Sequence, residues 1–278
     1  MVKLFIAVLL SFSALLADKA KTDDALSQKI QTFIKPEVYR QNKAYIDILF
    51  TPKSQYYKGQ RVDTVKVTQT LKENGLLKLF FKKPSELILH FKTSGSPLFF
   101  VKIMGDTLRN IGYYRYVTKE SNLDNSEFVW TISLSSEYAT DPFILQKELS
   151  KSSCTIIDIE RKNPKEWTYT IDMRDAHLNV EILKEDRELK LKRSLYSKWL
   201  DVSKVEKLRI TSSTRNSWYP YIAYYDSSMH LLKVIKKDIR RKKIVLNLEE
   251  NTHYLKISDI YTLKNIRDGL VIMPIGSR

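Results

Sequence analysis

A short aromatic stretch, SWYPYIAYYDSS at 217–228, holds the residues best suited to bind a small ligand. It places five aromatic rings within twelve residues, and such rings stack well on the faces of sugars or bases. Polar side chains beside the rings could hydrogen-bond the hydroxyl groups of a sugar. The candidate ligand-binding residues are Arg215, Asn216, Trp218, Tyr219 and Asp226.

The same rings could instead form the core of a β-sheet. A strand period of two puts Tyr221 and Tyr225 on one face and Tyr224 on the other. Tyr packs well in a core when its hydroxyl group lies at the rim. The pattern therefore predicts that most of these rings are buried. A ligand edge remains only if Trp218 and Arg215 are exposed together.

A basic stretch, KVIKKDIRRKK at 233–243, follows the aromatic one and contains seven basic residues and one acidic residue. Because it lies between two expected strands, we predict that it forms a projecting cationic hairpin. One interpretation is a contact with an anionic polymer or a membrane surface, and the other is a solvated loop. The candidate contact residues are Lys233, Lys236, Lys237, Arg240, Arg241, Lys242 and Lys243.

The whole chain of 278 residues is basic, with a formal net charge of +15. Such a balance favours anionic partners, which include cell-wall polymers, lipid head groups, acidic polysaccharides and nucleic acid. A second explanation is codon bias in an AT-rich genome, because Lys, Ile, Asn and Tyr are plentiful while Gly is scarce.

The first residues, MVKLFIAVLLSFSALLA, read as a secretory signal peptide. A short basic region precedes an apolar run of 13 residues from Leu4 to Leu16, which is shorter than a membrane-spanning helix. We expect cleavage near Ala17. The lone Cys154 allows no internal disulfide. Export together with the lack of a disulfide suits a bacterial periplasm. Export also argues against a nucleic-acid partner.

No catalytic or metal-binding motif stands out, so we expect no catalytic residue, no metal and no cofactor. The four histidines lack metal-ligand spacing, and seven glycines form no phosphate-binding loop. Cys154 opens an apolar run and reads as a small buried side chain. The alternative is a carbohydrate-active hydrolase whose carboxylates, among them Asp201, Asp226 and Asp259, assemble only in the fold. Each of these three lies at an expected strand end, where turn formation is the usual role.

The first half predicts an α+β domain. Residues 18–60 read as a helical N-terminal extension with a break at Pro36, and 61–175 as three helix–strand–strand repeats. The helices end near Leu71, Leu108 and Leu149, and each is followed by alternating strands. We expect a six-stranded, mainly antiparallel sheet with three helices on one face and a polar surface on the other.

The second half, 176–278, consists of eight short β runs without a helical period, which predicts an all-β sandwich of jelly-roll type. The segments YPYIAYYDSSMHLLKV and KIVLNLEENTHYLKISD, within about 200–260, resemble the jelly-roll accessory domains of secreted bacterial proteins. These are the pre-peptidase C-terminal and galactose-binding-like families. The resemblance implies a non-catalytic accessory or adhesive module. The N-terminal domain resembles no family that we recognise.

Together these features predict a non-enzymatic periplasmic protein that binds or scaffolds cell-envelope components. The expected partner is an envelope polysaccharide, cell wall or another protein, with a possible peripheral membrane contact and no nucleic acid. The sequence leaves the ligand and the oligomeric state open.

Overall fold

The computed structural model describes residues 25–278. The expected signal peptide, 1–17, lies outside the described residues, as does the start of the expected extension, 18–24. The chain divides into two compact units, Met1–Ala176 and His177–Arg278. Within the described part, no helix has both the length and the apolar character needed to cross a membrane.

Short helices open the described part of the first unit. They are a helix over residues 25–33, α2 (Pro36–Gln41), α3 (Lys43–Leu49) and the 3-10 turn η1 (Lys53–Tyr56), followed by the two-residue strands β1 (Tyr57–Lys58) and β2 (Arg61–Val62). Pro36 occupies the first turn of α2, where its missing N–H costs nothing, so the expected break is confirmed. The ring of Phe33 stacks on that of Trp167, with 6.2 Å between the ring centroids.

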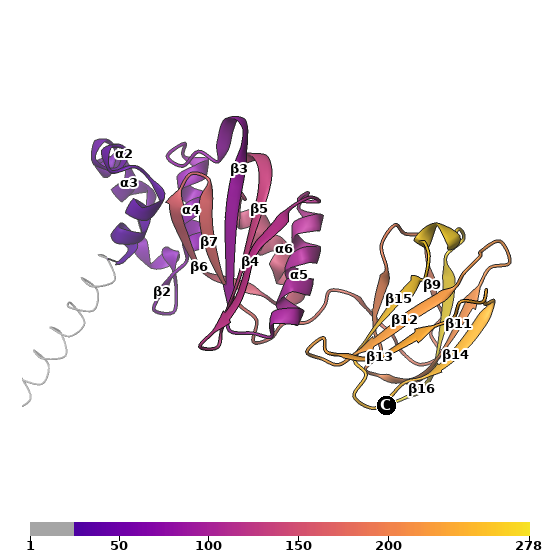
Figure 1. Cartoon of the computed structure of the whole chain (residues 1–278). Coiled ribbons are helices and arrows are strands. Elements are labelled where there is room, and N and C mark those ends of the chain that lie inside the picture. Colours follow the sequence, from indigo (N-terminus) through magenta and orange to yellow (C-terminus); the bar gives the residue numbers. More distant parts are fainter. Residues whose placement is uncertain (1–24) are drawn as a thin grey trace, which may run out of the picture. The chain divides into compact units, whose positions relative to one another are not determined.

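A five-stranded sheet forms the body of the first unit, in the order β4-β5-β3-β7-β6. Its elements are α4 (Thr64–Glu73), β3 (Phe80–Thr93), α5 (Pro97–Asn110), β4 (Val117–Asp124), β5 (Glu127–Tyr138), α6 (Pro142–Leu149), η2 (Ser150–Ser152), β6 (Thr155–Asn163) and β7 (Glu166–Asp172). The three α-helices pack on one face (Figure 1). Alternate residues of the strands, such as Leu89, Ile132 and Tyr169, are buried beneath them.

The expected six strands are wrong in number. The first expected repeat has one strand instead of two, because residues 76–79 are not in a strand and residues 80–93 form the single strand β3. Pro84 has no N–H to donate to a ladder, and the pairing of β3 with β5 is irregular between Phe80 and Ser85. β7 runs parallel to β3 and the other three pairings are antiparallel, so the sheet is mainly antiparallel, as expected.

Cys154 lies in the core of the first unit, with 1% of its surface exposed. Burial raises the pKa of its thiol to about 12, because the thiolate would lose its hydration. At pH 8 the thiol is therefore neutral and out of reach of reagents. We expect no reaction with Ellman's reagent in buffer and one thiol per chain in denaturant. Rapid labelling of the native protein would contradict this burial.

The second unit is built from two sheets. The first has the order β13-β12-β15-β10-β8 and the second β14-β11-β16-β9. The strands are β8 (Glu181–Ile182), β9 (Leu189–Leu191), β10 (Lys198–Asp201), β11 (Val205–Ser212), β12 (Pro220–Tyr225), β13 (Leu231–Lys236), β14 (Lys243–Asn247), β15 (Tyr254–Asp259) and β16 (Leu270–Ser277), with the 3-10 turn η3 (Leu263–Asn265). β10 was not predicted from the sequence.

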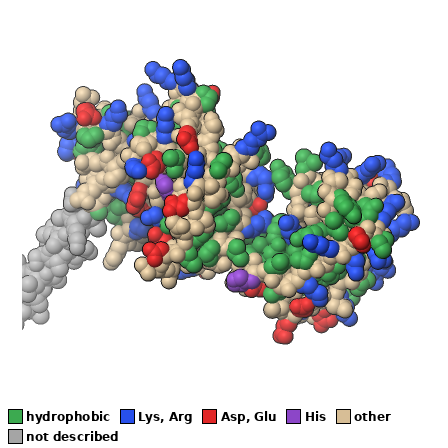
Figure 2. All heavy atoms as spheres, viewed as in Figure 1, with side chains coloured by type: hydrophobic (Ala, Val, Ile, Leu, Met, Phe, Trp, Pro, Cys, Tyr) green, Lys and Arg blue, Asp and Glu red, His purple; other side chains and the backbone are tan. Residues whose placement is uncertain are grey.

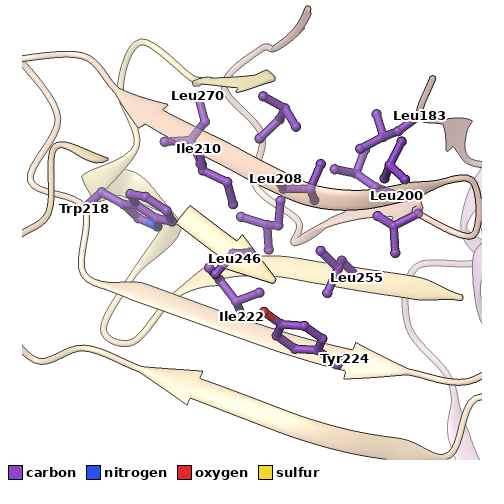
Figure 3. Packing of buried hydrophobic residues seen from close by; sticks show 14 of the residues in the cluster. Leu183, Leu200, Leu208, Ile210, Trp218, Ile222, Tyr224, Leu246, Leu255 and Leu270 are labelled. Carbon is purple, nitrogen blue, oxygen red and sulfur yellow. The ribbon is translucent and has the colours of Figure 1, made fainter. Parts of the chain in front are cut away.

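One hydrophobic core joins the two sheets. Ile222, Leu255 and Leu200 enter it from the first sheet, and Leu208 and Ile272 enter it from the second. Figure 3 shows Trp218 pointing into the same layer from the segment before β12. The alternation along β12 follows from this core, because Ile222 and Tyr224 point inward.

Candidate binding surface on the second unit

Four connections meet at one end of the sandwich. Pairing of Pro220 with Asp259 in one sheet, and of Ser212 with Leu270 in the other, places the corresponding strand ends together. The connections that lie there span residues 192–197, 213–219, 237–242 and 260–269. We call these four segments the loop end. The connection at 260–269 is drawn in yellow at the top of this unit in Figure 1.

The loop end is strongly basic. Its four connections contain nine Lys and Arg residues against two acidic ones, Asp238 and Asp268. The connections at the opposite end, 183–188, 202–204, 226–230 and 248–253, contain six Asp and Glu against three Lys and Arg. In Figure 2, Lys and Arg gather along the upper and right edges of this unit, while a group of Asp and Glu lies at its lower edge. Codon bias does not sort charges by their place in a fold, so the segregation favours a functional charge.

Two buried polar side chains hold the loop end together. Asn216 donates to the carbonyl oxygen of Gly269 at 2.7 Å and accepts from the backbone N–H of Asp268 at 2.9 Å. Asp259 accepts from the backbone N–H groups of Tyr219, at 2.8 Å, and of Tyr261, at 2.9 Å. These bonds satisfy backbone groups that would otherwise be buried without partners.

Further contacts link the connections to one another. The backbone N–H of Arg241 donates to the carbonyl oxygen of Trp218 at 2.9 Å. Arg215 lies 2.7 Å from Asp268, and the hydrogen bonds from Ser213 and then Arg215 lower the pKa of this carboxyl group. Three of the four connections, 213–219, 237–242 and 260–269, are therefore tied to one another by hydrogen bonds and an ion pair.

The expected ligand edge around Trp218 is wrong. Trp218 is fully buried and donates its indole N–H to the carbonyl oxygen of Ser258 at 2.9 Å, and Asn216 is buried as well. The side chain of Arg215, by contrast, is 79% exposed. Tyr219 is half-buried, with its ring centroid 5.0 Å from that of Tyr261. Asp226 follows β12 at the opposite end, so these five residues do not form one site.

The basic stretch is not a hairpin. β13 pairs with β12, whereas β14 pairs with β11 in the other sheet, so residues 237–242 cross between the two sheets. Lys233 lies away from the loop end, 3.0 Å from Glu249. The six other basic candidates remain at or beside the loop end, because β13 ends at Lys236 and β14 begins at Lys243. These six are Lys236, Lys237, Arg240, Arg241, Lys242 and Lys243.

Three partly exposed rings lie on the outer face of the first sheet. Trp199 of β10 contacts Tyr225, with 5.0 Å between the ring centroids, and Tyr221 lies on the same face. The ammonium group of Lys256 is 5.8 Å from the centroid of Trp199, and that of Lys236 is 5.5 Å from the centroid of Tyr221. A sugar stacking here would displace these cations from the ring faces, so this face is a weaker candidate than the loop end.

The first unit contains an open pocket of about 460 Å³ with mainly apolar walls. Its lining residues are Lys72, Leu79, Phe80, Ile111, Tyr113, Ser136, Tyr138, Ala139, Thr140, Asp141 and Ile144. Asp141 is the single carboxylate among them. It caps α6 through the backbone N–H of Phe143 and lies 2.6 Å from Lys72. A glycosidase needs two carboxyl groups across a cleft, and this pocket offers one that is already paired.

The three aspartates proposed for a hydrolase form turns instead. Asp201 accepts from Ser203, Asp226 from the backbone N–H of Ser228, and Asp259 from several backbone groups of its own turn. Burial is the largest single influence on the pKa of Asp201 and of Asp226, and it disfavours their ionised forms. The hydrogen bonds that each carboxylate accepts, from His253 and Ser203 or from His230 and Ser228, together with the nearby histidine, outweigh burial and lower both pKa values. No shifted carboxyl pKa among the described residues is raised, as a general acid would require.

One line of polar groups on the open face of the first sheet has the order of a catalytic triad. Nδ1 of His90 is 2.9 Å from the Thr131 hydroxyl oxygen, and Nε2 is 3.3 Å from a Glu166 carboxylate oxygen. Thr131 is only 4% exposed, so its oxygen is not accessible to a substrate. Residues 25–278 also contain no group of three or more His, Cys, Asp and Glu able to hold a metal ion.

Sequence reasoning missed the apolar residues of the loop end. Leu195, Ile239 and Tyr261 are 71%, 62% and 65% exposed, and they lie in three different connections. Each has basic residues close by in the sequence. They could have been recognised by asking which connections of a two-sheet sandwich share an end.

Comparison with family models, curated proteins and solved structures found no match for this chain.

Proposed function

We propose that this chain is a non-enzymatic, exported periplasmic protein whose second unit binds an anionic component of the cell envelope through its loop end. The observation that carries the proposal is the segregation of charge, with nine basic residues against two acidic ones in the four connections. A surface with clustered basic residues attracts polyanions without requiring a deep pocket. The apolar leader at 1–17 supports export.

We further propose that the second unit is a jelly roll. The support is its strand order: along one sheet β9 neighbours β16, which neighbours β11, which neighbours β14. Along the other sheet β10 neighbours β15, which neighbours β12, which neighbours β13. This interleaving of eight strands is that of two Greek keys folded together, with β8 added at one edge.

For the first unit we propose a scaffolding role built on repetition. α5–β4–β5 and α6–β6–β7 are each a helix followed by an antiparallel hairpin, on opposite sides of β3. Both helices begin at a Pro that follows a polar residue, at Ser96-Pro97 and Asp141-Pro142. The first expected copy, which begins with α4, has one strand, β3, so the repeat is complete only twice.

A charge-removal variant tests the proposed function. Changing Lys236, Lys237, Arg240 and Arg241 to Ala is expected to weaken binding to peptidoglycan and to a soluble anionic polysaccharide by about tenfold or more at 0.15 M salt. Binding of the wild type should also fall as salt is raised. Sedimentation with peptidoglycan and titration with the polysaccharide measure both effects.

The matched control removes four exposed lysines of the first unit, Lys78, Lys82, Lys83 and Lys147. It changes the net charge equally and should leave binding nearly unchanged. Equal losses in the two variants would mean that overall charge, not the loop end, is responsible. Binding by the first variant that is unchanged from the wild type and insensitive to salt would contradict the proposal.

A further inference from the structure

The loop end combines positive charge with exposed apolar tips. Leu195, Ile239 and Tyr261 come from three different connections of the same end, and each is more than half exposed. Large apolar side chains gathered on one surface mark an interaction site more often than a solvated one. A hydrated polysaccharide gains little from Leu or Ile, which offer neither hydrogen bonds nor a flat ring.

A lipid bilayer matches both features. Anionic head groups attract Lys and Arg. Leu and Ile are stabilised when they bury apolar surface at the boundary between head groups and acyl chains, and Tyr is favoured at the same boundary. The basic residues of the loop end come from the same connections as the apolar tips: Lys192 and Arg193 precede Leu195, and Arg240 and Arg241 follow Ile239. One bilayer surface could therefore contact the basic residues and the apolar tips at the same time.

The loop end is also organised before binding. Asn216 and Asp259 fix the backbone of the connections that carry Tyr261 and Arg215. A small apolar pocket of about 20 Å³ lies between the connections at 192–197 and 260–269, lined in part by Leu191, Tyr196 and Ile266. A surface that is already ordered loses little conformational freedom when it docks.

From these observations we infer that the loop end docks on an anionic lipid membrane and inserts Leu195, Ile239 and Tyr261 into the head-group layer. The inference rests on the proposed function and names its partner: a lipid surface, not a glycan. The basic residues bring the unit to the membrane, and the three apolar tips hold it there. The opposite end, with its excess of acidic residues, faces away from the anionic surface.

Vesicle binding tests the inference. Vesicles of phosphatidylglycerol and phosphatidylethanolamine are compared with vesicles of phosphatidylcholine, by co-sedimentation of the full chain without its expected leader. We expect the wild type to bind the anionic vesicles and to bind phosphatidylcholine at least about tenfold more weakly. Changing Leu195, Ile239 and Tyr261 to Ser should reduce binding to the anionic vesicles by about 100-fold.

A matched control changes three exposed apolar residues elsewhere in the second unit, Ile182, Leu231 and Val245, to Ser. This variant should bind the vesicles as the wild type does. The variant with Leu195, Ile239 and Tyr261 changed to Ser, here called the tip variant, should still bind the soluble anionic polysaccharide, because its basic residues are intact. This second measurement separates a lost insertion from a misfolded unit.

A fluorescent probe reports insertion directly. The chain's single cysteine, Cys154, is buried, so an Ile239→Cys variant can be labelled at residue 239 with a polarity-sensitive dye. The dye emission should shift to the blue on addition of the anionic vesicles, whereas the same dye on a Leu231→Cys variant should not respond. Equal responses at the two positions would overturn the insertion.

The outcomes distinguish the two proposals. If the tip variant binds the anionic vesicles as tightly as the wild type, the inference fails while the proposed function stands. If the wild type ignores vesicles but binds the polysaccharide, the partner is a glycan and the inference fails. If the wild type binds neither, both fail.

Discussion

Replacing Trp218 by Ala is expected to lower the free energy of unfolding of the second unit by about 3–5 kcal/mol. The indole is fully buried between the two sheets, among Ile210, Leu270 and Ile222 (Figure 3). Its removal leaves a large cavity and also deprives the carbonyl oxygen of Ser258 of its donor. Domains of this size are stable by about 5–15 kcal/mol, so the loss is a large part of the total.

Denaturant titration followed by circular dichroism measures this loss, and two variants sharpen it. Trp218→Phe keeps most of the buried ring and loses the hydrogen bond, so it should cost less than Trp218→Ala. Trp199→Ala removes a partly exposed indole from the outer face and should cost less still. If Trp218→Ala and Trp199→Ala had the same free energy of unfolding, Trp218 would have to lie on the surface. Trp218 would then again be a candidate for ligand binding.

The periodic parts of the chain were predictable because burial imposes a period. In β3, Leu87, Leu89 and Phe91 recur at every second residue, and all three are buried. Two local signals have the same predictive value: Pro97 starts α5, and Gly75, with a positive φ, follows α4. In each case a local rule of backbone geometry or of one-sided burial suffices, with no knowledge of distant residues.

Features that depend on which strands pair were not predictable. The basic stretch reads as a hairpin because consecutive strands often pair, yet β13 and β14 belong to different sheets. β10 was missed because four residues, KWLD, are too short to show alternation. Trp218 was a candidate for a ligand edge because the polar residues Arg215 and Asn216 precede it, but Trp218 is buried, and Asn216 is buried as a partner for the backbone.

Only part of the loop end could be predicted from the sequence, because the rest depends on which strands pair. Its longest basic stretch is continuous in the chain, so Arg240 and Arg241 were recognised as candidates. Its other parts, Lys192, Arg193 and Arg267, come from connections that are far apart in sequence. They meet only because both sheets end at the same place, which the strand order decides.

Gly269 lies where the connection at 260–269 enters β16, and it meets β9 at very short range. Its φ of +76° lies in the left-handed region, which residues with a Cβ atom rarely adopt. A Cβ atom there would lie 1.8 Å from the carbonyl oxygen of Leu191, which is backbone and cannot swing away. The carbonyl oxygen of Gly269 also accepts the hydrogen bond from Asn216.

Gly269→Ala is therefore expected to destabilise the second unit by about 3 kcal/mol or more, through the left-handed backbone and the clash together. Gly276→Ala is the matched control in the same unit. Its φ is +71°, but the nearest atom, 2.7 Å from the new Cβ, is a side-chain carboxylate oxygen of Glu206, which can move. The control should cost about 1–2 kcal/mol, mainly from the backbone. Denaturant titration of both variants measures the difference, and equal losses would mean that β9 does not approach Gly269 this closely.

Gly269→Ala should also weaken vesicle binding, because the clash displaces the connection that carries Tyr261. Gly276→Ala should leave vesicle binding unchanged, since Gly276 lies at the opposite end of β16.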